Sequence, residues 1–169
     1  MITIRPEQPE DISGIHQVNT LAFGQLQEAD LVDALRRADA LTLSLVAVQD
    51  DRIIGHIAFS PVTITSDTTI VDAIGLAPMA VLPALQRHGI GSQLVEAGLG
   101  TCSETDYGVV IVLGHPNFYP RFGFTPAQPY GIVWEHDAPE EAFMVRELKK
   151  GALAQTQGVV RYRPEFDVV

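Results

Sequence analysis

The chain has 169 residues, of which 46% are hydrophobic and 19% charged, and 21 acidic against 11 basic residues give a formal net charge of −10. This length and composition fit one domain with a buried core and exclude a disordered chain. The short apolar runs exclude a membrane span, the single cysteine excludes an intrachain disulfide, and the scattered basic residues exclude a nucleic-acid-binding stripe. We therefore expect a soluble, cytoplasmic protein with a single domain over residues 1–169, in which the tail from about residue 151 is the least defined part.

The N-terminal part of the chain predicts one strand followed by two helices. Apolar and polar residues alternate over residues 1–5, which is typical of a strand. Pro9 suits the first turn of a helix that ends near Gly24. Leu31, Val32 and Leu35 then form the apolar face of a second helix over residues 28–38.

An antiparallel meander of three strands is expected between residues 41 and 82. The apolar period changes to two at Leu41, and polar residues at 49–52 and 66–67 mark two turns. Residues 41–48, 53–65 and 68–82 are the predicted strands. Pro78 lacks the N–H group that a central ladder needs, so we expect a bulge or a splayed edge near it.

The second half of the chain predicts a parallel strand pair around a helix. An amphipathic helix over residues 89–104 precedes a continuous apolar strand over residues 107–113, which is the pattern of a βαβ unit. Helical turns over residues 115–122 and strands from Gly123 and over residues 142–147 follow. Together the elements predict an α/β (α+β) fold with a mixed, mostly antiparallel twisted sheet of roughly six or seven strands and about four helices.

A glycine-containing loop before the helix at residues 89–104 is the strongest candidate binding site. Gly89 and Gly91 allow a positive φ and a close approach of the backbone to a ligand. The N–H groups and the dipole of the following helix favour an anion, and Arg87 adds positive charge. The pattern therefore predicts a pyrophosphate site formed by Gln86, Arg87, His88, Gly89, Ile90, Gly91 and Ser92.

Two common phosphate-binding loops do not match this segment. A Walker loop requires Lys and then Ser or Thr after the second glycine, whereas Ser92 and Gln93 follow here. A Rossmann fingerprint requires a third glycine where the chain has Leu94. Taken alone, the loop has a structural alternative, namely a turn before a helix in which Arg87 is a solvated surface charge.

Two motifs together make the chain resemble the GNAT-superfamily N-acetyltransferases. Residues 86–91 have the form Gln-x-x-Gly-x-Gly, and residues 119–124 have the form Tyr-x-x-x-Gly-Phe. One predicted helix and one predicted strand separate them, as in that family. The fragments at residues 55–57 and 113–116 also resemble the small bacterial branch of predicted acetyltransferases, and the resemblance extends over residues 2–147.

The resemblance implies acetyl-coenzyme A as co-substrate and direct transfer of its acetyl group to a primary amine in a ternary complex. It implies that main-chain groups of Met79, Ala80 and Val81 contact the pantetheine arm and the thioester, where an N–H group can stabilise the oxyanion. It also implies that Tyr119 donates a proton to the leaving thiolate. The structural alternative for Tyr119 is that its ring only packs between elements.

The sequence does not identify the base that deprotonates the amine. Glu28, Asp72 and His115 are candidates, and an imidazole is attractive because it titrates near neutrality. Glu28 has a structural alternative at the positive end of a helix dipole, and His115 has one as the cap of a strand end. The five histidines show no metal-ligand spacing, so no metal is expected.

The expected function is therefore that of an acetyl-coenzyme A-dependent N-acetyltransferase. Its partner would be a small-molecule or peptide amine, with no nucleic acid and no membrane, and a homodimer is compatible with the sequence. Two alternatives stay open: a non-catalytic acyl-coenzyme A-binding sensor or interaction module, and a nucleotide-using enzyme that uses the glycine loop differently. The acceptor amine is not specified by any pattern in the chain.

Overall fold

The computed structural model describes residues 1–169 and contains three α-helices. These are α1 (Ile12–Phe23), α2 (Gln27–Arg37) and α3 (Ile90–Cys102). The nine strands are β1 (Thr3–Pro6), β2 (Leu43–Gln49), β3 (Arg52–Thr65), β4 (Ile70–Val81), β5 (Val109–Leu113), β6 (Thr125–Pro126), β7 (Ile132–Trp134), β8 (Phe143–Glu147) and β9 (Gly158–Arg161).

The chain divides into two compact units, and the long strands β3 and β4 contribute residues to both. Unit 1 comprises Met1–Ser60, Ala77–Gly100 and Pro164–Val169. Unit 2 comprises Pro61–Leu76 and Thr101–Arg163. Each unit is described by itself below.

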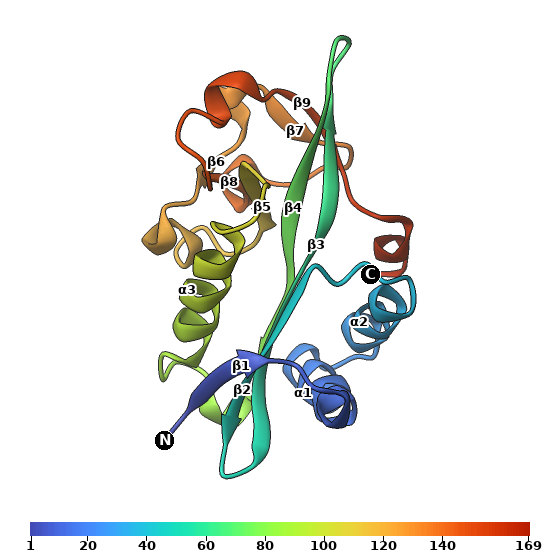
Figure 1. Cartoon of the computed structure of the whole chain (residues 1–169), viewed down its shortest axis with the longest axis vertical. Coiled ribbons are helices and arrows are strands. Elements are labelled where there is room, and N and C mark those ends of the chain that lie inside the picture. Colours follow the sequence, from blue (N-terminus) through green and yellow to red (C-terminus); the bar gives the residue numbers. More distant parts are fainter. The chain divides into compact units, whose positions relative to one another are not determined.

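Unit 1 combines an antiparallel strand group with the three helices. Strand β1 pairs with β2, and β2 pairs with β3, both in antiparallel register. Helices α1 and α2 lie side by side (Figure 1). Helix α1 ends at Gly24, whose φ of 69° is left-handed and whose N–H donates to the Thr20 carbonyl at 2.9 Å. Glycine at this position stops the helix without steric cost, as the sequence predicts.

Helix α3 packs closely on β3 because glycines leave room for large side chains. A Cβ atom at Gly98 of α3 would lie only 2.5 Å from Cε1 of Phe59, whose side chain is fully buried. In the opposite direction, a Cβ atom at Gly55 of β3 would lie 3.0 Å from Cδ1 of Leu94. These two contacts hold the helix against the strand and thereby position the N-terminus of α3.

Unit 2 is built around its own apolar core. Within it, β4 pairs in parallel with β5, with Gly75 opposite Ile111, and β8 pairs antiparallel with β5 and with β6. Strand β9 pairs antiparallel with β3 and in parallel with β7. The buried core residues are Val62, Ile64, Ala73, Val109, Ile111, Ala127, Ile132, Phe143, Val145, Leu153 and Val160.

The predicted fold class and the predicted parallel pair are confirmed, while the element counts differ. The structure has nine strands where six or seven were expected, and three α-helices where about four were expected. The additional strands include β7 and β9, which have three and four residues and are too short for an apolar period to show. The expected fourth helix is a 3₁₀ turn over Tyr119–Phe122, in which Pro120 and Gly123 limit its length.

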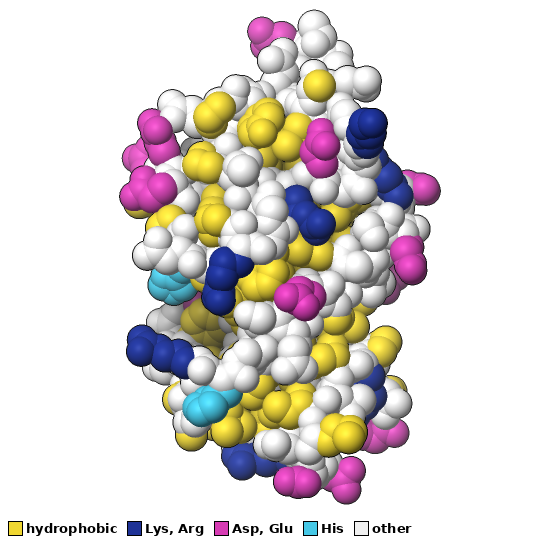
Figure 2. Space-filling view, turned by 90° about the vertical axis from the view of Figure 1, so that its left-hand side faces the viewer, with side chains coloured by type: hydrophobic (Ala, Val, Ile, Leu, Met, Phe, Trp, Pro, Cys, Tyr) yellow, Lys and Arg dark blue, Asp and Glu magenta, His cyan; other side chains and the backbone are white.

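Two observations concern the helices and one face of the surface. None of the helices combines the length and the apolar character that a membrane span needs. On the face drawn in Figure 2, basic side chains are interspersed among acidic and hydrophobic ones and form no continuous stripe.

Candidate functional site

The predicted pyrophosphate loop lies in unit 1, between the end of β4 and the start of α3. Arg87 and Gly89 both adopt left-handed conformations, with φ values of 65° and 85°. Residues 86–89 are exposed, whereas Ile90 is buried and anchors the first turn of the helix. Left-handed residues in a short loop are typical of concave sites where backbone amides bind anions.

Backbone amides are available where α3 begins. The first hydrogen bond into the helix runs from the Gln93 N–H to the Gly89 carbonyl at 3.1 Å. The N–H groups of Ile90, Gly91 and Ser92 therefore precede it and have no acceptor within the helix. A Cβ atom at Gly89 would meet no atom within 4 Å. Glycine is therefore favoured at position 89 by the left-handed φ and not by a lack of space for a side chain. The loop backbone is thus open to an approaching ligand.

Two polar side chains hold the loop in shape. Gln86 donates from Nε2 to the Val81 carbonyl at 3.1 Å and so ties the loop to the last residue of β4. The Nδ1 atom of His88 lies 2.8 Å from the Gln86 carbonyl, and since a carbonyl only accepts, His88 donates there. The glutamine of the sequence motif therefore has a visible structural role besides any contact with a ligand.

The hydrogen bond from Gln86 to the Val81 carbonyl also holds the predicted thioester segment, residues 79–81, next to this loop. Ala80 and Val81 are buried, Met79 is half-buried, and all three lie at the C-terminal end of β4. The Leu82 N–H donates to the Ile54 carbonyl of β3 at 2.9 Å, which fixes the exit of the strand. Pro78 lies inside β4, and its peptide bond with Ala77 is cis. All of the predicted cofactor-binding residues thus lie on one continuous strand–loop–helix segment of unit 1.

Tyr119 lies in unit 2, and its ring is enclosed by aromatic and backbone atoms. The ring centroids of Phe118 and Phe124 are 5.0 Å and 5.7 Å away in edge-to-face arrangements. A Cβ atom at Gly114 would collide with the Tyr119 ring, so the ring lies directly on the backbone that follows β5. Burial raises the pKa of Tyr119 to about 12, and the phenol is therefore protonated at neutral pH, as a general acid must be.

The candidate bases occupy different environments. His115 is exposed, and its carbonyl accepts the N–H groups of Phe118 at 3.1 Å and Tyr119 at 3.3 Å, so its main chain helps to shape the turn that carries Tyr119. Glu28 lies in the first turn of α2 in unit 1, where its carboxylate accepts two hydrogen bonds from Gln25 Nε2, at 2.9 Å and 3.1 Å. Asp72 is exposed on β4. None of these contacts singles out one group as the base.

A buried polar chain in unit 1 was missed by the sequence reasoning. His56 of β3 is completely buried, and its Nδ1 lies 3.1 Å from Asn19 Nδ2 of α1. Asn19 Nδ2 also donates to the Ile15 carbonyl at 3.0 Å, which identifies it as the amide nitrogen and makes His56 Nδ1 the acceptor. The proton of the neutral imidazole is therefore on Nε2, which donates to Ser44 Oγ at 2.8 Å.

This series of side-chain hydrogen bonds continues from Ser44 of β2 to an ion pair near the surface. The Ser44 hydroxyl donates to the Glu7 carboxylate, and Arg36 of α2 donates to both oxygens of that carboxylate at 2.9 Å and 3.0 Å. Burial lowers the pKa of His56 to about 4, so its imidazole is neutral at physiological pH. Sequence periodicity does not reveal such a hydrogen-bond series, because its residues come from separate elements. Of these residues, only His56 belongs to a fragment that the sequence comparison noted, residues 55–57.

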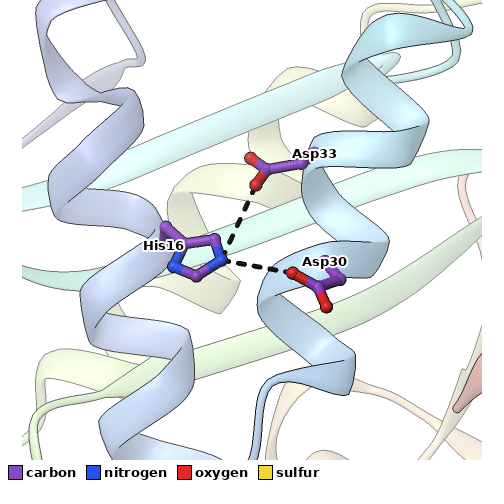
Figure 3. A group of neighbouring side chains, drawn as sticks. All are labelled: His16, Asp30 and Asp33. Atoms are coloured by element: carbon purple, nitrogen blue, oxygen red, sulfur yellow. Dashed lines mark hydrogen bonds and ion pairs between the residues drawn. The ribbon is translucent and has the colours of Figure 1, made fainter.

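A second polar cluster joins α1 to α2 within unit 1 (Figure 3). His16 Nε2 lies 3.3 Å from Asp30 Oδ1 and 3.7 Å from Asp33 Oδ2. The three side chains are of types that bind metals, and their ligand atoms lie within 4.8 Å of one another. Asp33 also accepts a hydrogen bond from Arg36 at 3.0 Å, so its charge is partly compensated by the protein. We ascribe the cluster to helix pairing.

Known proteins resemble the chain over nearly its whole length. A family model described as "Acetyltransferase (GNAT) domain" matches residues 3–127. The uncharacterized N-acetyltransferase YhbS of Escherichia coli K12 is 38% identical over 165 residues, which is 97% of this chain and 98% of that protein. The uncharacterized N-acetyltransferase YjhQ of the same organism is 37% identical over 137 residues, 76% of each chain.

Two solved structures are similar in sequence and in fold. The crystal structure of Escherichia coli YhbS in complex with CoA matches with a TM-score of 0.92 and 37% identity, covering 98% of this chain and 92% of that one. A GNAT acetyltransferase from Brucella melitensis in complex with acetyl-CoA matches with a TM-score of 0.79 and 37% identity over 99% of both chains. The sequence motifs, the α/β fold and these relatives agree, and the chain therefore belongs to the GNAT family of acetyltransferases and is an acyltransferase enzyme.

Proposed function

We propose that the protein is an acetyl-coenzyme A-dependent N-acetyltransferase that transfers the acetyl group directly to a primary amine in a ternary complex. The observation that carries this proposal is the loop at residues 86–92, where a left-handed Gly89 and helix-start amides without an acceptor in the helix support an anion site. Relatives at 37% identity bind CoA or acetyl-CoA in their crystals, which supports the same co-substrate here. That the two units act together as one domain is part of this proposal.

In this proposal the coenzyme is held by main-chain groups of unit 1. The amides of residues 89–92 bind the pyrophosphate, with added positive charge from Arg87, and Gln86 and His88 keep the loop in the binding conformation. Main-chain groups of Met79, Ala80 and Val81 bind the pantetheine arm and the thioester. An N–H group in that segment stabilises the oxyanion of the tetrahedral intermediate.

The reaction then needs one bond exchange and two proton transfers. The amine nitrogen attacks the carbonyl carbon of the thioester, a C–N bond forms, and the C–S bond breaks. The phenolic proton of Tyr119 passes to the sulfur, so free coenzyme A thiol leaves and the phenolate regains a proton from solvent. The amine gives up its proton to water or to a base, for which Glu28, Asp72 and His115 are the candidates.

Release of free thiol from acetyl-coenzyme A across a panel of amines tests the proposal. The panel contains polyamines, free amino acids, and peptides with an open N-terminus or an internal lysine. We expect thiol release to accompany mass-confirmed acetylation of at least one amine. Acetyl-coenzyme A binding without thiol release from any amine or from water would instead support the sensor or interaction module.

A ligand comparison separates the remaining alternative. Binding to the native state raises the apparent stability of a protein, so the thermal midpoint reports which ligand fits the loop. We expect acetyl-coenzyme A to raise the midpoint, and NAD and ATP to leave it unchanged at equal concentration. A shift with NAD or ATP alone would indicate a nucleotide-using enzyme.

A further inference from the structure

Besides pairing two helices of unit 1, the cluster of His16, Asp30 and Asp33 has the composition of a transition-metal site. His16 lies on α1, and the two aspartates lie one turn apart on α2. The Nε2 side of the imidazole faces both carboxylates (Figure 3). One imidazole nitrogen and two carboxylate oxygens are ligands that Zn²⁺ takes in proteins. Because they come from two different helices, no spacing within the sequence reveals the set.

The distances within the cluster fit a shared cation better than direct charge-assisted hydrogen bonds. His16 Nε2 lies 3.3 Å from Asp30 Oδ1 and 3.7 Å from Asp33 Oδ2. A hydrogen bond between an imidazolium and a carboxylate would bring such atoms to about 2.7–2.9 Å. Around a tetrahedral Zn²⁺ with bonds of about 2.0–2.2 Å, two ligand atoms lie about 3.3–3.6 Å apart. All three ligand atoms lie within 4.8 Å of one another, and the exposed Asp30 side chain can turn to shorten the longest separation.

Arg36 orients one of the two carboxylates toward the imidazole. Its Nη1 donates to Asp33 Oδ1 at 3.0 Å, while the other oxygen of Asp33 faces His16. Arg36 is fixed in turn by both oxygens of Glu7, at 2.9 Å and 3.0 Å. Hydrogen bonds to the outer side of a ligand orient the ligands of protein metal sites in the same way. One oxygen of Asp33 is therefore held in place for a cation.

The charges of the cluster and its neighbours complement a divalent ion. The carboxylates of Glu7, Asp30 and Asp33 outnumber the guanidinium of Arg36 by two, so these groups together carry two negative charges. A divalent cation neutralises them. Mg²⁺ prefers oxygen ligands in a near-ideal octahedral shell, whereas an imidazole suits Zn²⁺. The ligand set therefore favours Zn²⁺ over Mg²⁺.

We propose that His16, Asp30 and Asp33 bind one Zn²⁺ ion that links α1 to α2, with water completing its coordination shell. The metal binds His16 through the lone pair of Nε2, so the imidazole is neutral in the complex and any proton on Nε2 is released to solvent. Without the ion, the same side chains join the two helices directly. The proposal does not rest on the proposed acetyl transfer, because none of the three residues has a role in it.

Calorimetric titration of the untagged protein with ZnCl₂, after treatment with a chelator and dialysis, tests the site. We expect one Zn²⁺ to bind per chain, and MgCl₂ at the same concentration to give no binding. Asp30→Asn and His16→Gln are each expected to weaken Zn²⁺ binding by about a hundredfold or more, since losing even a hydrogen-bond partner of a ligand costs about 10–100-fold. Asp30 is exposed, so Asp30→Asn leaves the core intact.

The matched control is His136→Gln, which removes another histidine that lies beside a carboxylate. His136 Nε2 lies 3.8 Å from Glu135 Oε1, and its side chain is more exposed than that of His16. This variant is expected to keep the wild-type affinity for Zn²⁺. If Zn²⁺ does not bind the wild type, or binds Asp30→Asn and His16→Gln as tightly as the wild type, the proposal is overturned. Loss of binding in His136→Gln would move the ion to that histidine and would equally overturn it.

Thermal unfolding tests whether the ion links the two helices. An ion that binds the native state raises the apparent stability, so ZnCl₂ is expected to raise the thermal midpoint of the wild type and of His136→Gln. The midpoint of Asp30→Asn is expected to stay unchanged at the same concentration of ZnCl₂. An equal rise in Asp30→Asn would show that the stabilising ion binds elsewhere, and would contradict the proposed link between α1 and α2.

Discussion

Tyr119 combines a fixed position with a proton that it retains at neutral pH. Its ring is held between Phe118 and Phe124 and lies on Gly114, so the ring has little freedom. Burial raises its pKa to about 12, because a phenolate is poorly solvated there. The contacts with Phe118, Phe124 and Gly114 all involve the ring. The effect of the hydroxyl on activity can therefore be tested separately from the effect of the ring on packing.

At this scale, Tyr119→Phe is expected to lower kcat by about a hundredfold or more while the Kd for acetyl-coenzyme A stays within about twofold of wild type. The reason is that the ring contacts persist in phenylalanine and only the hydroxyl, which is the proposed acid, is removed. Steady-state kinetics and a direct binding titration measure the two quantities. Parallel losses in kcat and in binding would indicate that Tyr119 serves the architecture of the pocket and not proton transfer.

At the scale of elements, α3 depends on glycines for two different reasons. Gly89 precedes the helix with a left-handed φ of 85° and open space around it, whereas Gly98 has no unusual backbone conformation but lies against Phe59. Gly100 has neither constraint, because nothing lies within 4 Å of a Cβ placed there and its φ is not left-handed. One helix therefore offers a site position, a packing position and a matched control.

Gly89→Ala is expected to weaken acetyl-coenzyme A binding by about tenfold. An alanine disfavours the left-handed conformation by roughly 1–2 kcal/mol, so the loop and its amides leave the binding arrangement. Gly100→Ala on the same helix is the control and keeps wild-type affinity. Isothermal titration calorimetry measures both. An unchanged affinity for Gly89→Ala would argue against the placement of the pyrophosphate at this loop.

Gly98→Ala is expected to destabilise the fold, in contrast to Gly100→Ala. The new methyl group would lie 2.5 Å from Cε1 of the fully buried Phe59, and such overpacking costs about 1–3 kcal/mol, more than the gain of up to about 1 kcal/mol in helix propensity. Gly100→Ala keeps the propensity gain without the collision. Urea unfolding monitored by circular dichroism compares the two. Equal stabilisation of both variants would show that α3 can shift away from β3 at little cost.

At the scale of the whole molecule, several buried polar groups make stability depend on pH in one direction. Burial lowers the pKa of His56 to about 4, so the unfolded chain binds a proton at a higher pH than the folded chain. For Glu7, burial alone would raise the pKa, but hydrogen bonds from Arg36 and Ser44 outweigh it and the pKa is lowered. The Arg5 hydrogen bond likewise lowers the pKa of Asp11 against the effect of burial. Folding stability from all three groups is therefore lost on acidification.

The lowered pKa of His56 predicts how the free energy of unfolding changes between about pH 6.5 and about pH 4. In this window the unfolded state holds one more proton at His56, so the free energy of unfolding falls as the pH falls, by about 1.4 kcal/mol per unit at most. Denaturant unfolding at several pH values measures the slope. In His56→Gln, whose amide can still accept from Asn19 and donate to Ser44, this slope is expected to flatten. His136→Gln, which removes an exposed histidine, is the control, and equal slopes in the two variants would contradict the assignment.

Apolar periodicity and the positions of turn-forming residues were sufficient to predict most of the helices and strands. The expected helix over residues 28–38 corresponds to α2, and the continuous apolar run before Leu113 became β5, in parallel with β4 as the βαβ pattern predicts. These features are local or depend on a repeated period, so they can be predicted directly from the sequence. Strands β7 and β9 were missed because a segment of three or four residues is stabilised by its partner and carries no period of its own.

The sequence by itself determined the fold class and the family resemblance, and it predicted an anion-binding loop, since each rests on neighbouring residues with a strict spacing. Only the tertiary structure brought His56 between Asn19 and Ser44, and placed Tyr162 on Gly75. Such contacts join residues that are tens of positions apart, and their selection depends on strand register and side-chain packing, which no local pattern encodes. For that reason the place of the candidate coenzyme loop was predictable, and the surroundings of Tyr119 were not.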